Sequence, residues 1–291
     1  MRRFLGIITV ILFLGSCNNI DKRSIGGEAL GTTYEITYYS VDDYKLKRPL
    51  DSIFERVNQS MSTYRETSDI SQLNEGDTTV KVDTLFLKVF AWSQEVHEKS
   101  GGYFDPTVGN LVNLYGFGPE KGILEADSAR VDSLMQFVGL EKVKISKEGT
   151  ITKQRPGIYL DFNAIAKGYT IDLIGHYLNS LGIENYLIEL GGELLAQGMN
   201  INKDATWIIG IDDPNQGVER TTTAAVQLID RGMATSGNYR KNRIDPETGQ
   251  LFVHTINPLT VFAEISDVLS ATVLAENCAL AAAWATAFVA M

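Results

Sequence analysis

The chain has 291 residues, of which 44% are hydrophobic and 21% are charged. This balance supplies enough apolar surface for one large core or two modest ones and excludes a largely disordered protein. The formal net charge is -10, and Lys and Arg form no cluster. A nucleic-acid surface needs clustered cations to displace counterions from phosphates, so we expect no nucleic-acid partner.

The first 17 residues are typical of a secretory signal, because two arginines precede an apolar run over residues 4–14 and small residues follow. The run is too short to span a bilayer of about 30 Å. Residues 14–17 (LGSC) also resemble a bacterial lipobox, in which the Cys carries the lipid. We therefore expect residues 1–17 to be a lipoprotein signal with Cys17 as the lipidated residue. The protein would then be exported and held by lipid at the cell envelope. The alternative is an ordinary signal followed by a lone Cys.

Residues 18–27 are polar and are expected to form a tether. After it, hydrophobic spacing and turn residues predict strands and helices without a regular β-α-β alternation. In chain order the predicted elements are a strand over 29–39, helices over 49–61, 83–99 and 127–138, a hairpin over 143–152, a strand over 158–162, a helix over 166–181, strands over 186–190, 194–197, 207–211, 224–229 and 268–274, and a helix over 279–291.

This mixture predicts an α+β fold with mixed sheets and packed helices, in one domain over residues 28–291. The sequence stops within the last predicted helix without a capping residue, so we expect the domain to be truncated at its C-terminus. If Cys17 carries lipid, Cys278 has no partner for an intrachain disulfide.

Familiar catalytic motifs such as HExxH, CxxC, GxSxG and the Walker loop are absent from the sequence. The three histidines lie far apart, so a histidine-based zinc site is not expected. Any metal would be a hard ion held by oxygen atoms.

Six short clusters instead combine Gly or small residues with an aromatic residue, an acid or a hydroxyl. Such composition suits sites where the backbone approaches a ligand closely and a few side chains orient it. The clusters are MSTY (61–64), GGYFDPTVG (101–109), DFNAIAKGY (161–169), ELGGE (189–193), ATSGNYR (234–240) and HTINP (254–258). Any one of them alone is also consistent with an ordinary turn.

Taken together and in this order, the clusters resemble those of the ApbE family of FAD:protein FMN transferases, from about residue 28 to the end. The resemblance implies that the protein cuts FAD at its pyrophosphate, releases AMP and attaches FMN to a threonine hydroxyl of a partner protein. It also implies a requirement for Mg²⁺. A few members of the family instead hydrolyse FAD to FMN and AMP.

The resemblance further implies roles for individual residues of this chain. The residues expected to contact FAD are Leu30 and Tyr64 on the flavin, Tyr103, Phe104 and Asp105 in the cofactor pocket, Asp161 as a hydrogen-bond acceptor, Lys167 near the phosphates and Ile256 near the adenine or flavin. His254 is the candidate general base for the attacking hydroxyl, since imidazole titrates near neutral pH. Structural alternatives remain open: Tyr64 and Phe104 as core residues, and Asp161 with Lys167 as a surface ion pair.

The resemblance implies a Mg²⁺ site that uses the Ala164 carbonyl together with an Asp and a Thr four residues apart on the last helix. This chain has Ala282 and Thr286 at those two positions, so the carboxylate is missing. Mg²⁺ relies on carboxylates and phosphates, and its binding should therefore be weakened. Val261 also stands where the family often has Gly.

The leading hypothesis is a lipid-anchored FMN transferase that modifies exported electron-transfer proteins. A second is an FAD pyrophosphatase that uses water as the acceptor. A third, favoured by Ala282, is a flavin-binding lipoprotein without catalysis. The last is a structural lipoprotein with no ligand.

Overall fold

The computed structural model describes residues 20–119, 128–216, 221–238, 242–244, 249, 251–261, 263 and 267–291. Within these residues the main sheet has six strands in the order β1-β2-β5-β6-β9-β12, and every neighbouring pair is antiparallel. Its strands are β1 (Asp21–Ala29), β2 (Thr32–Ser40), β5 (Tyr186–Leu190), β6 (Glu193–Gln197), β9 (Arg231–Gly237) and β12 (Ser270–Ala275).

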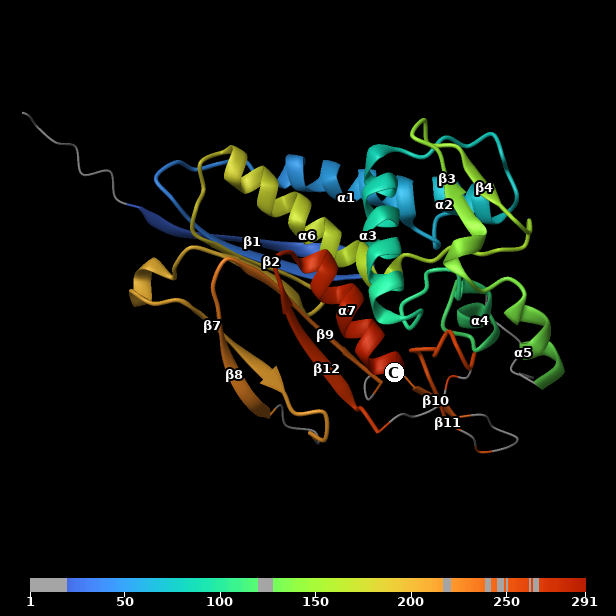
Figure 1. The fold of residues 1–291 in the computed structure, drawn as a ribbon. Coiled ribbons are helices and arrows are strands. Elements are labelled where there is room, and N and C mark those ends of the chain that lie inside the picture. The colour runs from blue at the N-terminus through green and yellow to red at the C-terminus, as the bar shows by residue number, and fades with distance from the viewer. Residues whose placement is uncertain are drawn as a thin grey trace, which may run out of the picture.

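Helices cover one face of this sheet (Figure 1). The helix α6 (Asn163–Ser180) lies on β5 and β6, and α7 (Cys278–Ala290) lies on β9 and β12. Around them the chain forms α1 (Lys47–Met61), α2 (Asp69–Asn74), α3 (Thr84–Ser100), α4 (Gly109–Leu114) and α5 (Ser128–Met135). The combination of an antiparallel sheet with helices on one side confirms the α+β fold class.

Three short two-stranded ribbons complete the described structure. They are β3 (Val143–Ile145) with β4 (Ile151–Lys153), β7 (Trp207–Asp212) with β8 (Thr222–Leu228), and β10 (Asn242–Ile244) with β11 (Leu251–Val253). Single turns of 3-10 helix lie at Leu140–Lys142 and Ile201–Lys203.

The two faces of the sheet are both buried, because successive side chains of a strand point to opposite faces. Tyr186, Ile188 and Leu190 of β5 pack in the core beneath α6 and α1. Leu187 faces the other way, against the core that Trp207 and Leu228 of the β7–β8 ribbon build. The sheet is therefore the middle layer. Both of its faces are covered, so its polar side chains can meet a ligand only at the ends of the strands.

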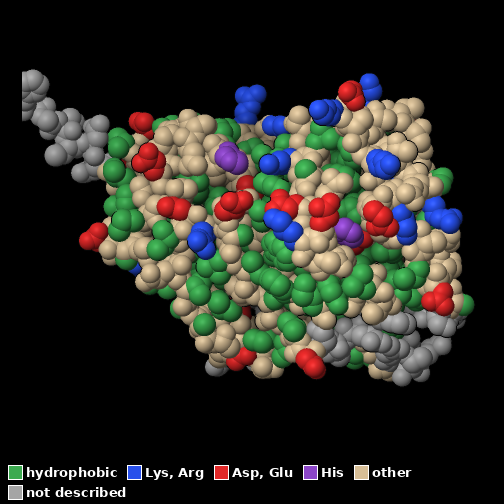
Figure 2. Space-filling view, viewed as in Figure 1, with side chains coloured by type: hydrophobic (Ala, Val, Ile, Leu, Met, Phe, Trp, Pro, Cys, Tyr) green, Lys and Arg blue, Asp and Glu red, His purple; other side chains and the backbone are tan. Residues whose placement is uncertain are grey.

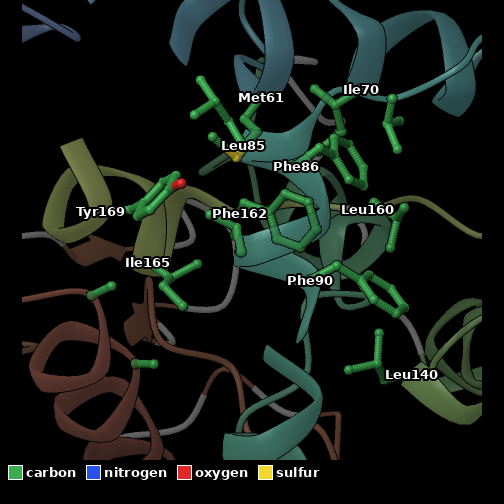
Figure 3. Packing of buried hydrophobic residues seen from close by; sticks show 14 of the residues in the cluster. Met61, Ile70, Leu85, Phe86, Phe90, Leu140, Leu160, Phe162, Ile165 and Tyr169 are labelled. Carbon is green, nitrogen blue, oxygen red and sulfur yellow. The ribbon is translucent and has the colours of Figure 1, made fainter. Parts of the chain in front are cut away.

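The largest core lies between α3, α6 and α7. In it the rings of Phe86 and Phe162 pack edge to face with centroids 5.0 Å apart (Figure 3). Figure 3 shows Phe162 between Phe86 and Ile165, with Tyr169 one turn further along α6. This packing fixes the first turns of α6, which carry Ala164 and Lys167.

Figure 2 shows acidic and basic side chains mixed over this face of the molecule, above a band of hydrophobic side chains. The exposed apolar residues of the C-terminal part include Val268, Leu269 and Phe288. No helix in the described residues has both the length and the apolar character that crossing a membrane requires. The predicted signal and Cys17 lie outside the described residues.

Three sequence predictions of local structure are wrong. The strand predicted over 29–39 begins too early, because Leu30 and Gly31 form the turn between β1 and β2. The polar stretch predicted as a tether forms most of β1, which pairs with β2 along its whole length. Residues 158–162 form no strand among the described residues, and only Tyr159 makes a bridge, to Val108. Asn74 replaces a partner strand there, because its side chain bonds both the N–H and the C=O of Leu160 at 2.8 Å.

The sequence patterns missed α2, α4, β9 and the β10–β11 ribbon, all of which are short or rich in small polar residues. They placed α3 correctly, since Asp83 caps it by accepting the Phe86 N–H at 2.9 Å and Gly101 ends it at φ 68°. The helix α6 begins at Asn163, three residues before its predicted start, so Lys167 is its fifth residue.

Candidate active site

Two hairpin turns lie side by side at one end of the strands of the main sheet. Leu30 and Gly31 join β1 to β2, and Gly191 and Gly192 join β5 to β6. The N–H of Gly191 donates to the Thr33 carbonyl at 3.0 Å, which links the two hairpins. All four turn residues have positive φ, of 50°, 73°, 59° and 89° in chain order. Two-residue hairpins require this conformation, and it explains the glycines.

Leu30 is the exception among these four residues, since a leucine at φ 50° is strained. Its side chain is half-buried and contacts both the α3–α6–α7 core and the core beneath α6. The strain holds an apolar side chain at the tip of a hairpin, where Asn or Gly would form the turn more easily. This position is compatible with the predicted contact to a flavin.

A buried ion pair joins α6 to the second turn. The Lys167 ammonium donates to Oε1 of Glu193, the residue that follows Gly192. Glu193 is only 8% exposed, whereas the Lys167 side chain keeps 31% of its surface accessible. Burial favours the neutral amine, but the Glu193 carboxylate outweighs it and the pKa of Lys167 is raised. Lys167 is thus a fixed cation with one accessible side.

The pKa of the Glu193 carboxyl is also raised, because the cost of burial exceeds the stabilisation by Lys167. Its second oxygen, Oε2, is buried and has no hydrogen-bond partner within the described residues. Glu193 belongs to the ELGGE cluster, and neither that cluster nor the family resemblance predicted a role for it. An acid directly after a Gly-Gly turn was the available signal, and its partner on α6 was invisible in the sequence.

Asp161 and Tyr64 lie at the start of α6. The Asp161 carboxylate accepts the backbone N–H of Asn163 at 2.7 Å and its side-chain amide at 3.1 Å. Burial raises the pKa of Asp161, and these two hydrogen bonds oppose the shift. The Asn163 amide also donates to Thr63 at 3.2 Å, which holds the MSTY segment against the helix.

Tyr64 is 64% exposed, so its ring is not a core residue. Partial desolvation and the nearby Asp161 carboxylate raise the pKa of its hydroxyl. Asp161 and Lys167 do not form an ion pair with one another in the described residues, because Lys167 pairs with Glu193. The structural alternatives for Tyr64 and for the Asp161–Lys167 pair therefore do not describe this protein.

The GGYFDPTVG segment is more deeply built into the structure than the resemblance implies. Phe104 is 3% exposed and belongs to the α3–α6–α7 core, and Tyr103 packs against that core. Asp105 accepts the Thr107 N–H at 2.8 Å and the Leu140 N–H at 3.0 Å, so its carboxylate fastens two loops. These contacts give the side chains of Phe104 and Asp105 structural roles.

The HTINP segment lies beside β9. Its Thr255 N–H donates to Asn238, which follows β9, at 3.4 Å. His254 is half-buried, with its ring edge toward Phe117 at a centroid distance of 6.4 Å. Ile256 is 5% exposed and packs in a core with Leu111 and Tyr115. Its burial leaves little surface for a ligand.

The last helix carries Ala282 and Thr286 on one face, together with Cys278. Ala282 is 4% exposed and packs against Ala234 of β9 and other alanines of α7. Asp172 of α6 fixes this helix, because its carboxylate accepts the N–H groups of Cys278 and Ala279 at 2.7 and 3.0 Å. Asp172 was not predicted as a functional residue, since nothing in the sequence shows that it meets a helix 106 residues away.

No group of three or more His, Cys, Asp or Glu side chains in the described residues could hold a metal ion. The oxygens of the predicted set are the Ala164 carbonyl and the Thr286 hydroxyl, both neutral. Among the buried side-chain atoms of the described residues that lack a hydrogen-bond partner, Oε2 of Glu193 is the one carboxylate oxygen. The donor chemistry therefore fits Mg²⁺ only if Glu193 takes part.

A cavity of about 620 Å³ lies apart from the Lys167–Glu193 pair. It is bounded by the end of α3, the Gly101–Gly102 turn, Asp105 and Pro258. It therefore touches two of the six clusters but neither Lys167 nor Tyr64. The chemistry that the polar groups indicate lies instead at the hairpin end of the strands.

The accessible Lys167 cation suits an anionic part of a ligand, and the exposed Tyr64 ring and the half-buried Leu30 suit an aromatic part. The model of the ApbE family matches residues 30–291. The chain therefore belongs to the ApbE family.

Its relatives include two proteins called FAD:protein FMN transferase. The one from Haemophilus influenzae is 34% identical over 287 residues, which cover 94% of this chain and 82% of that protein. The one from Vibrio cholerae is 34% identical over 300 residues, with coverages of 100% and 88%.

Solved structures agree with this assignment. The flavin transferase ApbE from Vibrio cholerae superposes with a TM-score of 0.82 at 33% identity, over 94% of this chain and 87% of that one. The apo form of the Pseudomonas stutzeri flavinyl transferase ApbE gives a TM-score of 0.82 at 28% identity, over 93% and 85%.

Proposed function

We propose that this protein transfers FMN from FAD to an acceptor protein and releases AMP. Relatives with the name FAD:protein FMN transferase match nearly the whole chain. The structural observation that carries the proposal is the grouping at the start of α6, where Asp161 and Tyr64 lie close together and Lys167 is held as a cation by Glu193. Tyr64 and Leu30 offer apolar surface to an isoalloxazine ring, and Lys167 offers charge to a pyrophosphate.

The reaction is a phosphoryl transfer in which a hydroxyl oxygen of the acceptor attacks the phosphorus on the FMN side of FAD. A new P–O bond joins FMN to the acceptor, and the bridging P–O bond to AMP breaks with its electron pair leaving on AMP. The hydroxyl proton goes to a base, for which His254 is the candidate. The finer proposal is that the acceptor hydroxyl belongs to a threonine.

Lys167 would contribute by stabilising the negative charge that develops on the phosphate oxygens. Its position is suited to this role because Glu193 keeps the ammonium charged and fixed before the substrate arrives. Asp161 would accept hydrogen bonds from FAD with a carboxylate already oriented by Asn163.

We also propose Mg²⁺ as the cofactor, with Ala164 and Thr286 among its oxygen ligands. When bound, Mg²⁺ would neutralise part of the pyrophosphate charge. Further proposals are that Cys17 carries lipid, that the first 17 residues are its signal, and that the protein acts on exported acceptors at the cell envelope. These rest on the sequence pattern of residues 14–17.

A flavin-binding protein without catalysis is the second candidate, and the missing carboxylate at Ala282 favours it. The test is AMP release from FAD in the presence of Mg²⁺, with and without a threonine-bearing acceptor. AMP together with covalent flavin on the acceptor supports the transferase. AMP and FMN without acceptor would indicate a hydrolase, and bound FAD with no AMP would indicate the flavin-binding protein.

A further inference from the structure

The protein itself uses only half of the Glu193 carboxylate. Oε1 accepts a hydrogen bond from Lys167, whereas Oε2 is buried and has no partner within the described residues. Glu193 is 8% exposed, so solvent does not readily supply the missing partner. Buried carboxylate oxygens are normally paired, and an exception indicates a ligand that completes the site.

The position of Glu193 relative to α7 follows from the strand register. Leu194 pairs with Met233, so Glu193 and Ala234 are the next opposed residues on the helix-covered face of the sheet. Ala234 in turn packs in one cluster with Ala282. Glu193 therefore approaches from the sheet the same part of α7 that carries Ala282.

A second contact places Glu193 at the start of the same helix face. The Cys278 thiol donates to the carbonyl of Met233 at 3.9 Å, and Met233 pairs with Leu194, the residue after Glu193. Cys278, Ala282 and Thr286 are spaced by four residues and share one face of α7. The neighbouring helix α6 offers two further groups. Ala164 and Lys167 are three residues apart on α6 and therefore lie on one side of it.

We infer that Glu193 is the anionic protein ligand of the divalent cation in this chain, replacing the carboxylate that is missing at position 282. The inference rests on the proposed function and goes beyond it by naming a ligand. Oε1 would remain with Lys167, and Oε2 would bind the cation. Glu193 thereby adds the one charged oxygen that the neutral oxygens of Ala164 and Thr286 lack.

The charges of Lys167 and Glu193 also predict that the cation and a nucleotide bind cooperatively. Lys167 and Glu193 form a pair that is neutral overall, so the pair attracts a dication only weakly by itself. A nucleotide pyrophosphate adds negative charge next to Lys167, and cation and nucleotide should strengthen each other's binding. We therefore expect Mn²⁺ to bind more tightly in the presence of ADP, which carries a diphosphate but no flavin.

The test measures Mn²⁺ binding to the purified protein by electron paramagnetic resonance, with ADP as the probe. Glu193→Gln keeps the size of the side chain and a hydrogen-bond acceptor for Lys167 but removes the charge. It should lower the Mn²⁺ affinity at least tenfold. Glu276→Gln, an exposed acid just before α7, makes the same charge change and should leave the affinity unaltered. Equal Mn²⁺ affinity in wild type and Glu193→Gln would overturn the inference.

The double variant Glu193→Gln with Ala282→Asp should recover most of the lost Mn²⁺ affinity, because the charge returns from the helix side. If Glu193→Gln does not fold, iron-mediated oxidative cleavage of the wild-type chain replaces it. Fe²⁺ at the site should cut the backbone near residues 191–194, and cuts confined to other segments would overturn the inference.

Binding of FAD, followed by the change in flavin fluorescence, separates this inference from the proposed function. A wild-type protein that binds neither FAD nor ADP contradicts the proposed function. A protein that binds FAD normally, but whose Mn²⁺ affinity is insensitive to Glu193→Gln, contradicts only the role of Glu193.

Discussion

Asp172 of α6 caps the first turn of α7 by accepting the backbone N–H of Cys278 at 2.7 Å. Its other oxygen accepts the N–H of Ala279 at 3.0 Å, so one buried carboxylate satisfies two of the unpaired donors of that helix. Gly168 allows the approach, because a Cβ there would lie 2.5 Å from the Cys278 carbonyl. Asp172 and Gly168 thus fix the start of α7, the helix that carries Thr286, against α6, the helix that carries Lys167.

Burial raises the pKa of Asp172 to about 7, against the opposing effect of the two N–H donors. A carboxyl whose pKa is higher in the folded state binds protons more tightly there than in the unfolded chain. Its contribution to the free energy of unfolding is therefore greatest in acid and declines as the pH rises from about 4 to about 7. Asp172→Asn should abolish this part of the pH dependence and also lower stability at neutral pH, since Asn accepts only one of the two N–H groups well.

Chemical denaturation between pH 4 and pH 8 tests this prediction for Asp172. The exposed Asp132 of α5 provides a matched control, because Asp132→Asn should leave both the stability and its pH dependence unchanged. A wild-type pH profile that Asp172→Asn does not alter would refute the assignment.

The Lys167–Glu193 pair allows stability and activity to be separated. Lys167→Met leaves Glu193 buried without its cation and should destabilise the protein by about 3 kcal/mol. Lys167→Met with Glu193→Gln removes both charges and should recover most of that loss. Neither variant should release AMP from FAD at the wild-type rate, because the cation is absent in both.

Denaturant titration and an AMP-release assay on the same samples check the behaviour of this pair. The interpretation fails if the double variant is as unstable as Lys167→Met. A wild-type rate of AMP release from the folded double variant would instead remove Lys167 from the catalytic machinery.

Leu30 should matter more for ligand binding than for stability. Its φ of 50° suits Asn better than Leu at this turn position. Leu30→Asn relieves strain of about 1 kcal/mol but also loses the apolar contacts with both cores, so stability should change little while FAD binding weakens. Thermal unfolding and FAD titration measure the two effects, and unchanged FAD affinity would show that the strain has another cause.

Ala282→Asp should raise the Mg²⁺ dependence of the protein. Without metal the new carboxylate would be buried among Ala234, Ala281 and Ala285, so the variant should melt at a lower temperature than the wild type. Added Mg²⁺ should reverse this loss and raise the rate of AMP release. The comparison is Ala281→Asp, at a fully buried neighbouring position, where Mg²⁺ should give no rescue. Identical responses of the two variants to Mg²⁺ would place the metal elsewhere.

The site residues differ in how far the sequence could predict their surroundings. Tyr64 is exposed and Asn163 orients Asp161, so both side chains are placed where the predicted roles stay open, and Lys167 lies on the helix that its neighbours predict. Phe104, Asp105 and Ile256 belong to the same recognisable clusters, yet their side chains are buried in structural contacts. Sequence clusters indicate where a chain is specialised, but they do not show which members face a ligand.

The sequence by itself determined the α+β class, the position of α3 and the family to which the chain belongs. These features depend on local patterns: hydrophobic spacing, a capping Asp, and glycines where φ must be positive. Only the tertiary structure decided that Lys167 pairs with Glu193, that Asp172 caps α7 and that Leu160 bonds the Asn74 side chain instead of a strand. These contacts join residues that are distant in the chain. They depend on which charges are buried together and on how the strands are aligned, and no local sequence pattern contains that information.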